Sequence, residues 1–419
     1  MLTARPRGTA DILPGEVGKW HALEAIVRQV CAVFGYHELR TPIFEHTELF
    51  GRGVGETTDI VEKEMYTFYD RGNRSITLRP EATAPVARAF VENKLFAQPL
   101  PVKVYYLGPM FRYGRPQTGR LRQFHQFGVE AIGSDDPAID AEVISLAMNF
   151  YREIGLKDVV LYLNSVGCPV CRLEYRSKLV NFLYSDLGAL CETCQARYYR
   201  NPLRIFDCKS PTCQGVIKQA PTITKNICPR CDESFAKVQK YLDIVGTNYI
   251  VDEKMVRGLD YYTRTTFEIV AQGIGAQNSI GGGGRYDGLV EQCGGPPSPG
   301  IGFALGLERI ILALDQQGIE LRINDVSRVF VAVVDPVADN KAFELLISLR
   351  QAGISTEKDF MSRSLKAQLK YADKIAARFV LFLGGEELTK SIVPVRDMST
   401  GEQKDVPLAE LLDYLKRHI

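Results

Sequence analysis

Long hydrophobic runs are missing from this chain of 419 residues, and so is an excess of charge of either sign. No apolar stretch approaches the ~18 residues that a helix needs to span a bilayer. The N-terminal segment MLTARPRGTADILPGE also lacks the apolar core of a secretory signal. We therefore expect a cytoplasmic protein that makes no membrane contact. The net charge of +1 gives no global field that would indicate nucleic-acid binding.

The sequence also lacks internal repeats, low-complexity segments and the glycine-lysine pattern of a P-loop. A chain of this length is too large for one hydrophobic core, so more than one domain is expected. We predict a first domain over residues 1–325 with a helical insertion at about 165–240, and a second domain over 326–419. In the second domain, short strands alternate with helical runs, which is typical of an α/β sheet covered by crossover helices. The polar stretch 315–327 is predicted to be a linker.

Hydrophobic spacing predicts the main elements of the first domain. Residues Glu16–Phe34 have the period of an amphipathic helix, and Tyr36–Phe50 are expected to be extended. A helix is expected to begin at Pro80. The strand Val102–Leu107 is expected to pair with Gln123–Ile132 as a hairpin around a long basic loop.

The most informative segments are Arg257–Tyr262 and Gly281–Asp287. Four consecutive glycines would let backbone approach a ligand where a side chain would collide. The tyrosines offer apolar faces with polar tips, and Arg257 and Arg285 offer rigid forks for carboxylate or phosphate. These features suit a small polar ligand with rings and charge. The alternative is a strand, a glycine turn and a second strand with no ligand.

The predicted hairpin is strongly basic, since residues 94–129 contain neither Asp nor Glu. Arg112 stands at the end of a strand and could hold a phosphate with both prongs of its fork. The glycine-containing loop that follows suits contact with a polynucleotide end through Arg115, Gln117 and Arg120. Alternatively, this is an exposed hairpin whose arginines are simply solvated.

Gln126 and Glu130 fall on one face of the second hairpin strand because side chains alternate along a strand. Burying them is costly unless they meet a polar ligand. Arg309 lies near the start of an apolar helix, where free N–H groups favour an anion. The alternative for Arg309 is an ion pair with Glu308 or Asp260.

Eight of the ten cysteines form four close pairs. The pairs are Cys168/Cys171, Cys191/Cys194, Cys208/Cys213 and Cys228/Cys231. Three of them have the CxxC spacing that presents two thiolates to one tetrahedral zinc. Disulfides are not expected in a cytosolic protein. The four pairs could build two structural zinc sites or one, or the cysteines could merely pack a small helical insertion.

Taken in order, these segments resemble the histidyl-tRNA synthetases, a family of class II aminoacyl-tRNA synthetases. Phe111-Arg112 resembles motif 2 of that class, and Gly306–Arg309 resembles motif 3. The region Tyr36–Pro42 is similar to motif 1. The segments Arg257–Tyr262 and Gly281–Tyr286 resemble the two peptides specific to the family. Further similarity is seen at Arg7–Asp11 and Leu78–Thr83.

The resemblance implies a catalytic domain built on a mixed, mainly antiparallel sheet flanked by helices, followed by an α/β anticodon-binding domain. It implies activation of L-histidine with ATP and Mg²⁺, transfer to tRNA(His), and a homodimer. Arg112 would grip the α-phosphate and the histidine carboxylate, Arg257 would act as an electrophilic catalyst over the α-phosphate, and Arg309 would hold the γ-phosphate. The insertion would lean over the acceptor stem of the tRNA.

The histidine contacts implied by the resemblance come from three segments. The α-amino group would be bound by Glu81, Thr83 and Gln126. The imidazole nitrogens would be bound by Glu130 and Tyr262, while Tyr261 and Tyr286 close the pocket. Such a site rejects other amino acids because their entry leaves buried polar groups unpaired.

One position departs from the class pattern. Many class II synthetases carry a glutamate two residues after the motif 2 arginine, near the adenine amino group, and here that residue is Gly114. Adenine recognition would then depend on backbone and on stacking by Phe124 or a neighbour. A second functional reading is a non-catalytic regulatory paralogue that senses histidine or tRNA. A short likeness to a class I loop at 361–364 is set aside, because none of the five histidines lies in the partner motif.

Overall fold

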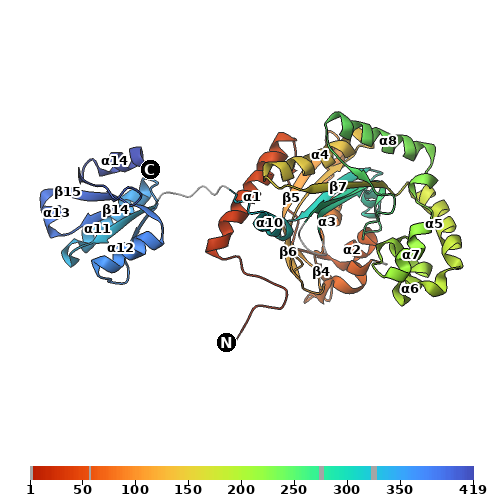
Figure 1. The fold of residues 1–419 in the computed structure, drawn as a ribbon, viewed down its shortest axis with the longest axis horizontal. Helices are drawn as coiled ribbons and strands as arrows, with labels where there is room; N and C mark the ends of the chain where they lie inside the picture. The colour runs from red at the N-terminus through yellow and green to blue at the C-terminus, as the bar shows by residue number, and fades with distance from the viewer. Residues whose placement is uncertain (1–2, 56–57, 273–277, 322–327) are drawn as a thin grey trace. The chain divides into compact units, whose positions relative to one another are not determined.

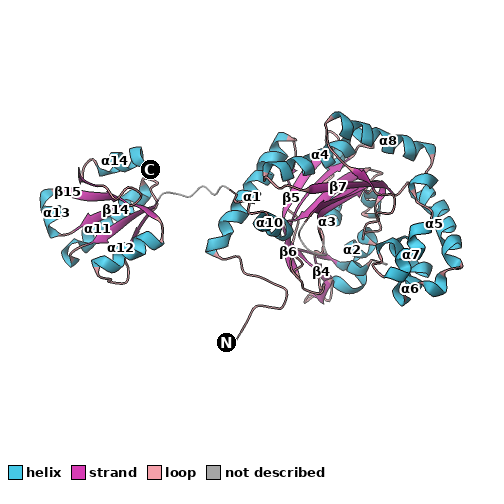
Figure 2. Cartoon of the chain, viewed as in Figure 1, coloured by secondary structure: helices cyan, strands magenta, loops and turns pink. Residues whose placement is uncertain are grey.

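The computed structural model describes residues 3–55, 58–272, 278–321 and 328–419. Its internal contacts divide the chain into two units, Met1–Ile323 and Asn324–Ile419. Figure 1 traces both along the chain, and Figure 2 distinguishes their helices from their strands. Within the described ranges, every helix is too short or too polar to cross a membrane.

An eight-stranded sheet lies at the centre of the first unit. In spatial order its strands are β1 (His37–Glu38), β5 (Val102–Phe111), β6 (Gln123–Ile132), β11 (Gly300–Gly306), β10 (Ser279–Arg285), β9 (Thr263–Ala271), β7 (Val159–Ser165) and β8 (Ile250–Val251). Neighbours pair antiparallel from β5 to β7, while the outer strands β1 and β8 pair parallel. This confirms the predicted mixed, mainly antiparallel sheet. The predicted hairpin of β5 and β6 is also confirmed, with Phe111 opposite Gln123.

The two faces of this sheet differ because side chains alternate along each strand. Phe127 and Val129 of β6 point into the apolar core, whereas Gln126 and Glu130 point to the other side. Strand register places Gly302 of β11 directly opposite Glu130. The second face is therefore lined by glycine and by a few polar side chains.

Four helices complete the core on the apolar face, and Figure 1 shows them beside the sheet. They are α1 (Pro14–Val33), α4 (Pro137–Glu153), α8 (Pro229–Ile244) and α10 (Leu307–Gln316). Helix α10 continues into the stretch predicted to be a linker, because Ala313 and Leu314 are buried and hold its last turns against the sheet. The remainder of that stretch from residue 322 lies outside the described residues.

A three-stranded sheet of β2 (Phe44–His46), β4 (Ser75–Leu78) and β3 (Tyr66–Tyr69) lies in the same unit. Helices α2 (Thr47–Val54), η1 (Ile60–Glu64), α3 (Thr83–Glu92), η2 (Leu95–Ala97) and α9 (Leu289–Gln292) accompany it. Two predictions were wrong here. The chain does not stay extended to Phe50 but turns into α2 at Thr47, burying Phe50 and Val54. Helix α3 begins at Thr83 rather than Pro80, because the Glu81 carboxylate accepts from the Thr83 and Ala84 amides.

The chain between β7 and β8 folds into helices joined by short loops. Its elements are α5 (Pro169–Tyr184), η3 (Leu187–Ala189), α6 (Glu192–Arg200), η4 (Pro202–Asp207), α7 (Pro211–Gln219), η5 (Thr224–Asn226) and α8. Helices α5, α6 and α7 form a compact group at one side of the sheet in Figure 1. Proline stands at the first position of α5, α7 and α8, where its fixed φ suits a helix start and no amide partner is lost.

The second unit has one five-stranded sheet in the order β13 (Thr356–Lys358), β12 (Arg328–Val333), β14 (Ala377–Leu383), β15 (Ile392–Asp397), β16 (Gln403–Pro407). Strands β13, β12 and β14 are parallel, and the last two are antiparallel. Its helices are η6 (Pro336–Ala338), α11 (Asp339–Gln351), α12 (Leu365–Lys374), α13 (Gly385–Lys390) and α14 (Leu411–His418). The predicted α/β pattern is confirmed, and its two edge strands, β13 and β16, are short and polar.

Candidate active site

A cleft of about 590 Å³ opens on the glycine-lined face of the large sheet. Its walls come from the start of α3, the β5–β6 hairpin, the segment 257–262, strands β10 and β11, and the start of α10. Cavities of this size suit a small-molecule ligand. Segments far apart in sequence therefore meet here, and they include the two that were most informative in the sequence.

Glycine is required on the floor because charged side chains lie directly on it. A Cβ at position 282 would lie 2.7 Å from Nη2 of Arg257. A Cβ at position 302 would lie 1.9 Å from Oε2 of Glu130. Real Cβ atoms do not approach so closely, so Gly282 and Gly302 make room for Arg257 and Glu130. The interpretation of these segments as two strands joined by a glycine turn was wrong: Arg257–Tyr262 form turns before β9, and the four glycines lie within strand β10, where they form part of the cleft floor.

The three arginines singled out in the sequence, Arg112, Arg257 and Arg309, all line this single cleft. Arg112 donates from Nε to the Pro80 carbonyl (2.8 Å), and its guanidinium lies 5.3 Å from the Phe124 ring centre. Arg309 donates to the carbonyls of Gly119 and Ser279 at 3.0 and 2.6 Å. These carbonyls orient the guanidinium groups while supplying no full negative charge.

The electrostatics of these arginines indicate a site for an anion. Burial lowers the pKa of Arg112, and burial together with the charges of Arg120 and Arg112 lowers the pKa of Arg309. Burial also opposes the charge of Arg257, but Glu268 at 2.8 Å offsets this and leaves its pKa raised. Like charges gathered in one cleft repel one another, and a bound polyanion would relieve that repulsion.

The polar end of the cleft centres on Glu130, which is fully buried. Its carboxylate accepts from Thr83 Oγ1 at 2.7 Å and from the Tyr286 hydroxyl at 2.6 Å. The rings of Tyr261 and Tyr262 are 4.8 Å apart, and Tyr261 also contacts Tyr286 at 5.9 Å. A carboxylate among three tyrosines forms a polar recess that suits an aromatic ring with N–H groups.

The buried atoms of this region that have no hydrogen-bond partner among the described residues include Gln126 Oε1 and Arg257 Nε. Both side chains line the cleft. A buried polar atom without a partner is costly, and a polar ligand would supply the missing bond. Glu81 is buried as well, and burial raises its pKa.

The three loop residues predicted to contact a polynucleotide do not gather in one place. Arg115 and Gln117 are exposed, in keeping with a surface contact. Arg120 instead turns into the cleft and pairs with Glu64 at 2.8 Å. Glu64 draws the guanidinium of Arg120 toward the cleft, and the contact of all three residues with a polynucleotide end stays a prediction.

Arg285 requires a larger correction. It was expected to present its fork to a ligand, yet its side chain is 0% exposed and pairs with Asp140 at 2.7 Å. It also donates to the carbonyls of Ser134 and Asp136. Arg285 is a core residue that ties β10 to the start of α4, and only Arg257 of the two signature arginines faces the cleft.

The paired cysteines lie outside the cleft and separate into two groups of four. One group is Cys168, Cys171, Cys228 and Cys231, and the other is Cys191, Cys194, Cys208 and Cys213. The sequence left open whether the four pairs build one zinc site or two. The positions of the sulfurs give two candidate metal sites.

Comparison with known proteins decides the family. The family model described as "Histidyl-tRNA synthetase" matches residues 8–179 and 185–310, and the model "Anticodon binding domain" matches residues 328–418. The chain belongs to the histidyl-tRNA synthetase family. A protein of Desulforamulus reducens named "Histidine--tRNA ligase" is 62% identical over 99% of both chains. One of the same name from Clostridioides difficile is 52% identical over 100% of both.

Solved structures agree with this family membership. The apo histidyl-tRNA synthetase of S. aureus aligns with a TM-score of 0.85 and 41% identity over 99% of each chain. A Bacillus halodurans structure titled "ATP phosphoribosyltransferase regulatory subunit/histidyl-tRNA synthetase" aligns with a TM-score of 0.65 at 20% identity, over 91% of this chain and 98% of that one. That second likeness shows a shared fold alone. The high identities to full-length ligases do not favour the regulatory reading.

Several residues of this histidyl-tRNA synthetase cleft were not found from the sequence. Glu64 lines the cleft, and its Oε1 lies 3.3 Å from where a Cβ at Gly114 would stand. Arg204 and Asp59 form an ion pair at 2.9 Å on the rim. The charges of these side chains are evident in the sequence, but their approach to the cleft depends on how η1 and the helical segment fold.

The buried Glu130 predicts a pH-dependent stability. Burial raises its pKa to about 8 from an ordinary value of 4.5. The native state thus holds this proton more tightly than the unfolded chain, so its contribution to stability is full below about pH 4.5 and is lost as pH rises to about 8. Relative to wild type, Glu130→Gln should gain on the order of 2 kcal/mol in unfolding free energy between pH 6 and pH 8. Denaturant unfolding followed by fluorescence of Trp20, the single tryptophan, would measure this in the first unit.

The other titratable groups are present in both wild type and Glu130→Gln, so their contributions to the unfolding free energy cancel in the comparison. Glu142→Gln is the matched control, since Glu142 is partly exposed and pairs with Lys103. A constant difference between wild type and Glu130→Gln across this pH range would contradict the raised pKa.

Proposed function

We infer that the protein activates L-histidine with ATP, giving histidyl-adenylate and pyrophosphate, and then transfers the histidyl group to the 3′ end of tRNA(His). The observation that carries this proposal is the convergence of Arg112, Arg257 and Arg309 on one cleft beside the buried Glu130. A triphosphate fits the arginines, and an imidazole fits the recess of tyrosines. Membership in the histidyl-tRNA synthetase family supports the same reaction.

In the first step, a histidine carboxylate oxygen attacks the α-phosphorus of ATP and pyrophosphate leaves. Arg112 holds the α-phosphate together with the histidine carboxylate, and Arg257 stabilises the negative charge that develops on the α-phosphate. Arg309 holds the γ-phosphate. Class II synthetases use ATP with Mg²⁺, which neutralises phosphate charge when bound.

The proposed histidine pocket takes its side chains from the start of α3 and the residues before it, from β6, from the end of β10 and from the segment 257–262. These side chains are Glu81, Thr83, Gln126, Glu130, Tyr261, Tyr262 and Tyr286. The first three bind the α-amino group. Glu130 and Tyr262 pair with the two ring nitrogens, and the remaining tyrosines exclude water.

Adenine recognition must work without a side chain at Gly114. Phe124 provides a ring for stacking, and Arg112 lies over that ring. Glu64 places its carboxylate next to Gly114 and supplies the acceptor that this position lacks. Its pairing with Arg120 holds that carboxylate at the cleft wall.

The remaining assignments concern the rest of the chain. Residues 1–325 form the catalytic domain with the insertion at about 165–240, and 326–419 form the anticodon-binding domain. Arg115 and Gln117 contact the acceptor end of the tRNA, and the chain works as a homodimer in the cytoplasm. Zinc bound by the paired cysteines is structural and takes no part in either chemical step.

Histidine-dependent exchange of pyrophosphate into ATP, measured with each of the twenty amino acids, tests the proposal. We expect exchange with histidine and a rate lower by at least about 10²-fold with the other nineteen, since they leave buried polar groups unpaired. Charging of tRNA(His) with labelled histidine tests the second step. Histidine binding without any exchange would instead identify a sensor paralogue and overturn the proposal.

A further inference from the structure

We propose that the eight paired cysteines bind two structural zinc ions, each held by four thiolates. The first ion connects α5 to α8, the first and last helices of the helical segment 169–244. Zinc site 1 is Cys168, Cys171, Cys228 and Cys231, and zinc site 2 is Cys191, Cys194, Cys208 and Cys213. The proposal is independent of the aminoacylation reaction, because neither site lines the cleft.

The sulfur positions match a tetrahedral site. Within each group, all four sulfurs lie within 4.8 Å of one another. Zinc–sulfur bonds of about 2.3 Å in a tetrahedron place sulfurs about 3.8 Å apart. The contacts observed are 3.5 Å for Cys168–Cys171, 4.0 Å for Cys171–Cys231 and 3.8 Å for Cys191–Cys208. These separations leave room for one ion at the centre of each group.

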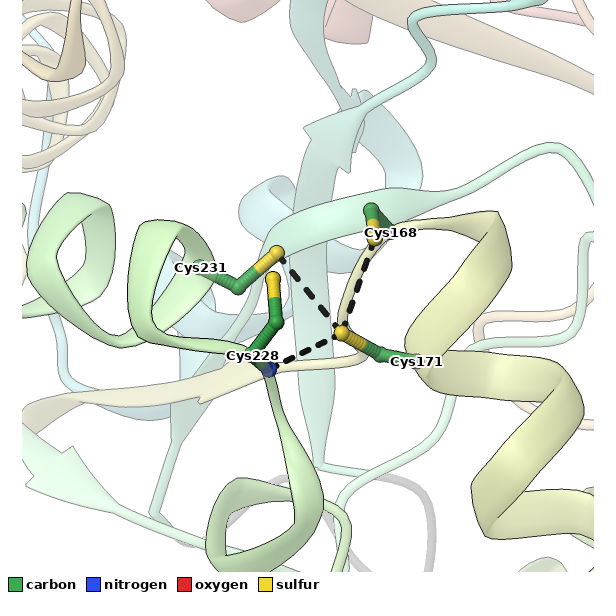
Figure 3. Close-up of side chains that lie close together, drawn as sticks. All are labelled: Cys168, Cys171, Cys228 and Cys231. Atoms are coloured by element: carbon green, nitrogen blue, oxygen red, sulfur yellow. Dashed lines mark hydrogen bonds between the residues drawn. The ribbon is translucent and has the colours of Figure 1, made fainter.

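Backbone amides point at the sulfurs, as they do where thiolates carry negative charge. The Cys228 amide donates to Cys171 Sγ at 3.0 Å, a contact drawn in Figure 3. In zinc site 2, the Cys191 amide donates to Cys213 Sγ at 3.2 Å and the Ser210 amide donates to Cys208 Sγ at 3.4 Å. Hydrogen bonds to an ionised acceptor are stronger than those to a neutral one, so this arrangement favours thiolates.

Neither disulfide bonding nor apolar packing accounts for the two clusters as well as zinc does. All ten cysteines are free, so the pairs are not disulfides. Simple packing as small hydrophobes needs no convergence of four sulfurs, and the unpaired Cys31 is buried without any such partner group among the described residues. Four sulfur donors in a tetrahedron select zinc or iron, and zinc is the usual occupant of a closed structural site.

Zinc site 1 joins the starts of the first and last helices of the helical segment, α5 and α8. Cys168 and Cys171 lie at the start of α5, whereas Cys228 and Cys231 lie at the start of α8 (Figure 3). Gly167 has φ +66°, and a Cβ there would lie 2.7 Å from Cys171 Cβ, so only glycine brings β7 into this site without strain. The ion would therefore close the loop of residues 172–227 at its base.

Zinc site 1 is also connected to the cleft through the residue that follows Cys171. Arg172 donates from Nη1 to the carbonyls of Asp260 and Tyr262 at 3.2 and 2.7 Å. Both carbonyls belong to the segment that carries Arg257 and the pocket tyrosines. Fixing the start of α5 thus also fixes this segment, and Arg172 acts as a positioning residue.

Metal analysis of the full chain, purified without chelators or metal-affinity resin, tests the proposal. We expect about two zinc ions per chain in wild type, about one in Cys228→Ser, about one in Cys191→Ser, and two in the control Cys293→Ser, whose thiol lies outside both groups. Zinc well below one ion per wild-type chain, iron in its place, or equal zinc in all four proteins would overturn it.

A second measurement covers the case in which a serine variant fails to fold. An organomercurial added to the folded wild type should release about two zinc ions per chain, read with a chromogenic chelator, while the denatured protein should show ten reactive thiols. Fewer thiols would show disulfides instead and sink the zinc assignment. Both readouts are independent of activity, so they stand whether or not histidine is activated.

Discussion

Replacing Arg257 with alanine is expected to lower the maximal rate of histidine-dependent pyrophosphate exchange by about 10²–10³-fold, with histidine affinity changed little. Arg257 lies on the glycine floor, where Gly282 leaves no gap beneath its guanidinium. Its contact with Glu268 at 2.8 Å orients the fork, and its Nε has no partner within the described residues. Its Nε–H is therefore available to donate to the α-phosphate as negative charge develops, and its loss acts on the transition state rather than on histidine.

The variants that accompany this experiment separate charge from geometry. Arg257→Lys keeps a cation but loses the planar fork, so an intermediate rate is expected. Arg152→Ala removes an exposed arginine from α4 of the same unit and should leave exchange unchanged. Measuring histidine binding by calorimetry completes the test. Normal turnover at saturating histidine, combined with a large loss of histidine affinity, would refute the electrophilic role of Arg257.

The features that were predictable from the sequence depend on local periodicity. Alternation along 123–132 placed Gln126 and Glu130 on one face, and the structure has them so. The basic loop between two strands was recognisable because the strands are apolar and the loop carries glycine and proline. The glycine run indicated a close backbone approach, and the side chains of Arg257 and Glu130 lie within contact distance of that floor.

The features that were not predictable depend on pairing between distant residues. Arg285 has the same local context as a ligand-binding arginine, and only its pairing with Asp140, 145 positions away, removes it from the cleft. Glu64 reaches Gly114 because η1 folds back over the hairpin, which no spacing in the sequence records. Local sequence sets what a side chain can do, while its neighbours in the fold decide which of these roles it takes.

The cysteines of the helical segment show both what the sequence predicts and what it does not. The spacing within each pair is local, and it correctly brings the two sulfurs of a pair together. The partner of each pair is a matter of helix packing: Cys168 and Cys171 meet Cys228 and Cys231 rather than the pair nearest in sequence. The second group of four cysteines therefore lies, along the chain, between the two pairs of the first group. This happens because α6 and α7 both pack on η4 before α8 returns to the sheet.

Glu130→Gln is expected to weaken histidine binding by about 10- to 100-fold at pH 8.5 while ATP binding stays within about twofold of wild type. At that pH, above the pKa of about 8, the wild-type carboxyl is mostly ionised and accepts from three donors at once: Thr83, Tyr286 and a ring N–H of the ligand. The amide has one acceptor oxygen and no charge, so it cannot satisfy all three. The hydrogen bond that is lost is the one to the histidine ring, because the hydroxyls of Thr83 and Tyr286 are held in place by the protein.

Equilibrium binding of histidine and of a non-hydrolysable ATP analogue measures both effects in the same preparation. Glu142→Gln, a similar change on the far side of the sheet that removes the partner of Lys103, should bind histidine as wild type does. Binding of 1-methyl- and 3-methylhistidine to wild type adds a chemical version of the test, because each blocks one ring nitrogen. If Glu130→Gln folds and binds histidine normally, the recess around Glu130 does not hold the imidazole. The pocket assignment would then have to move elsewhere in the cleft, although the arginine site for the triphosphate would remain.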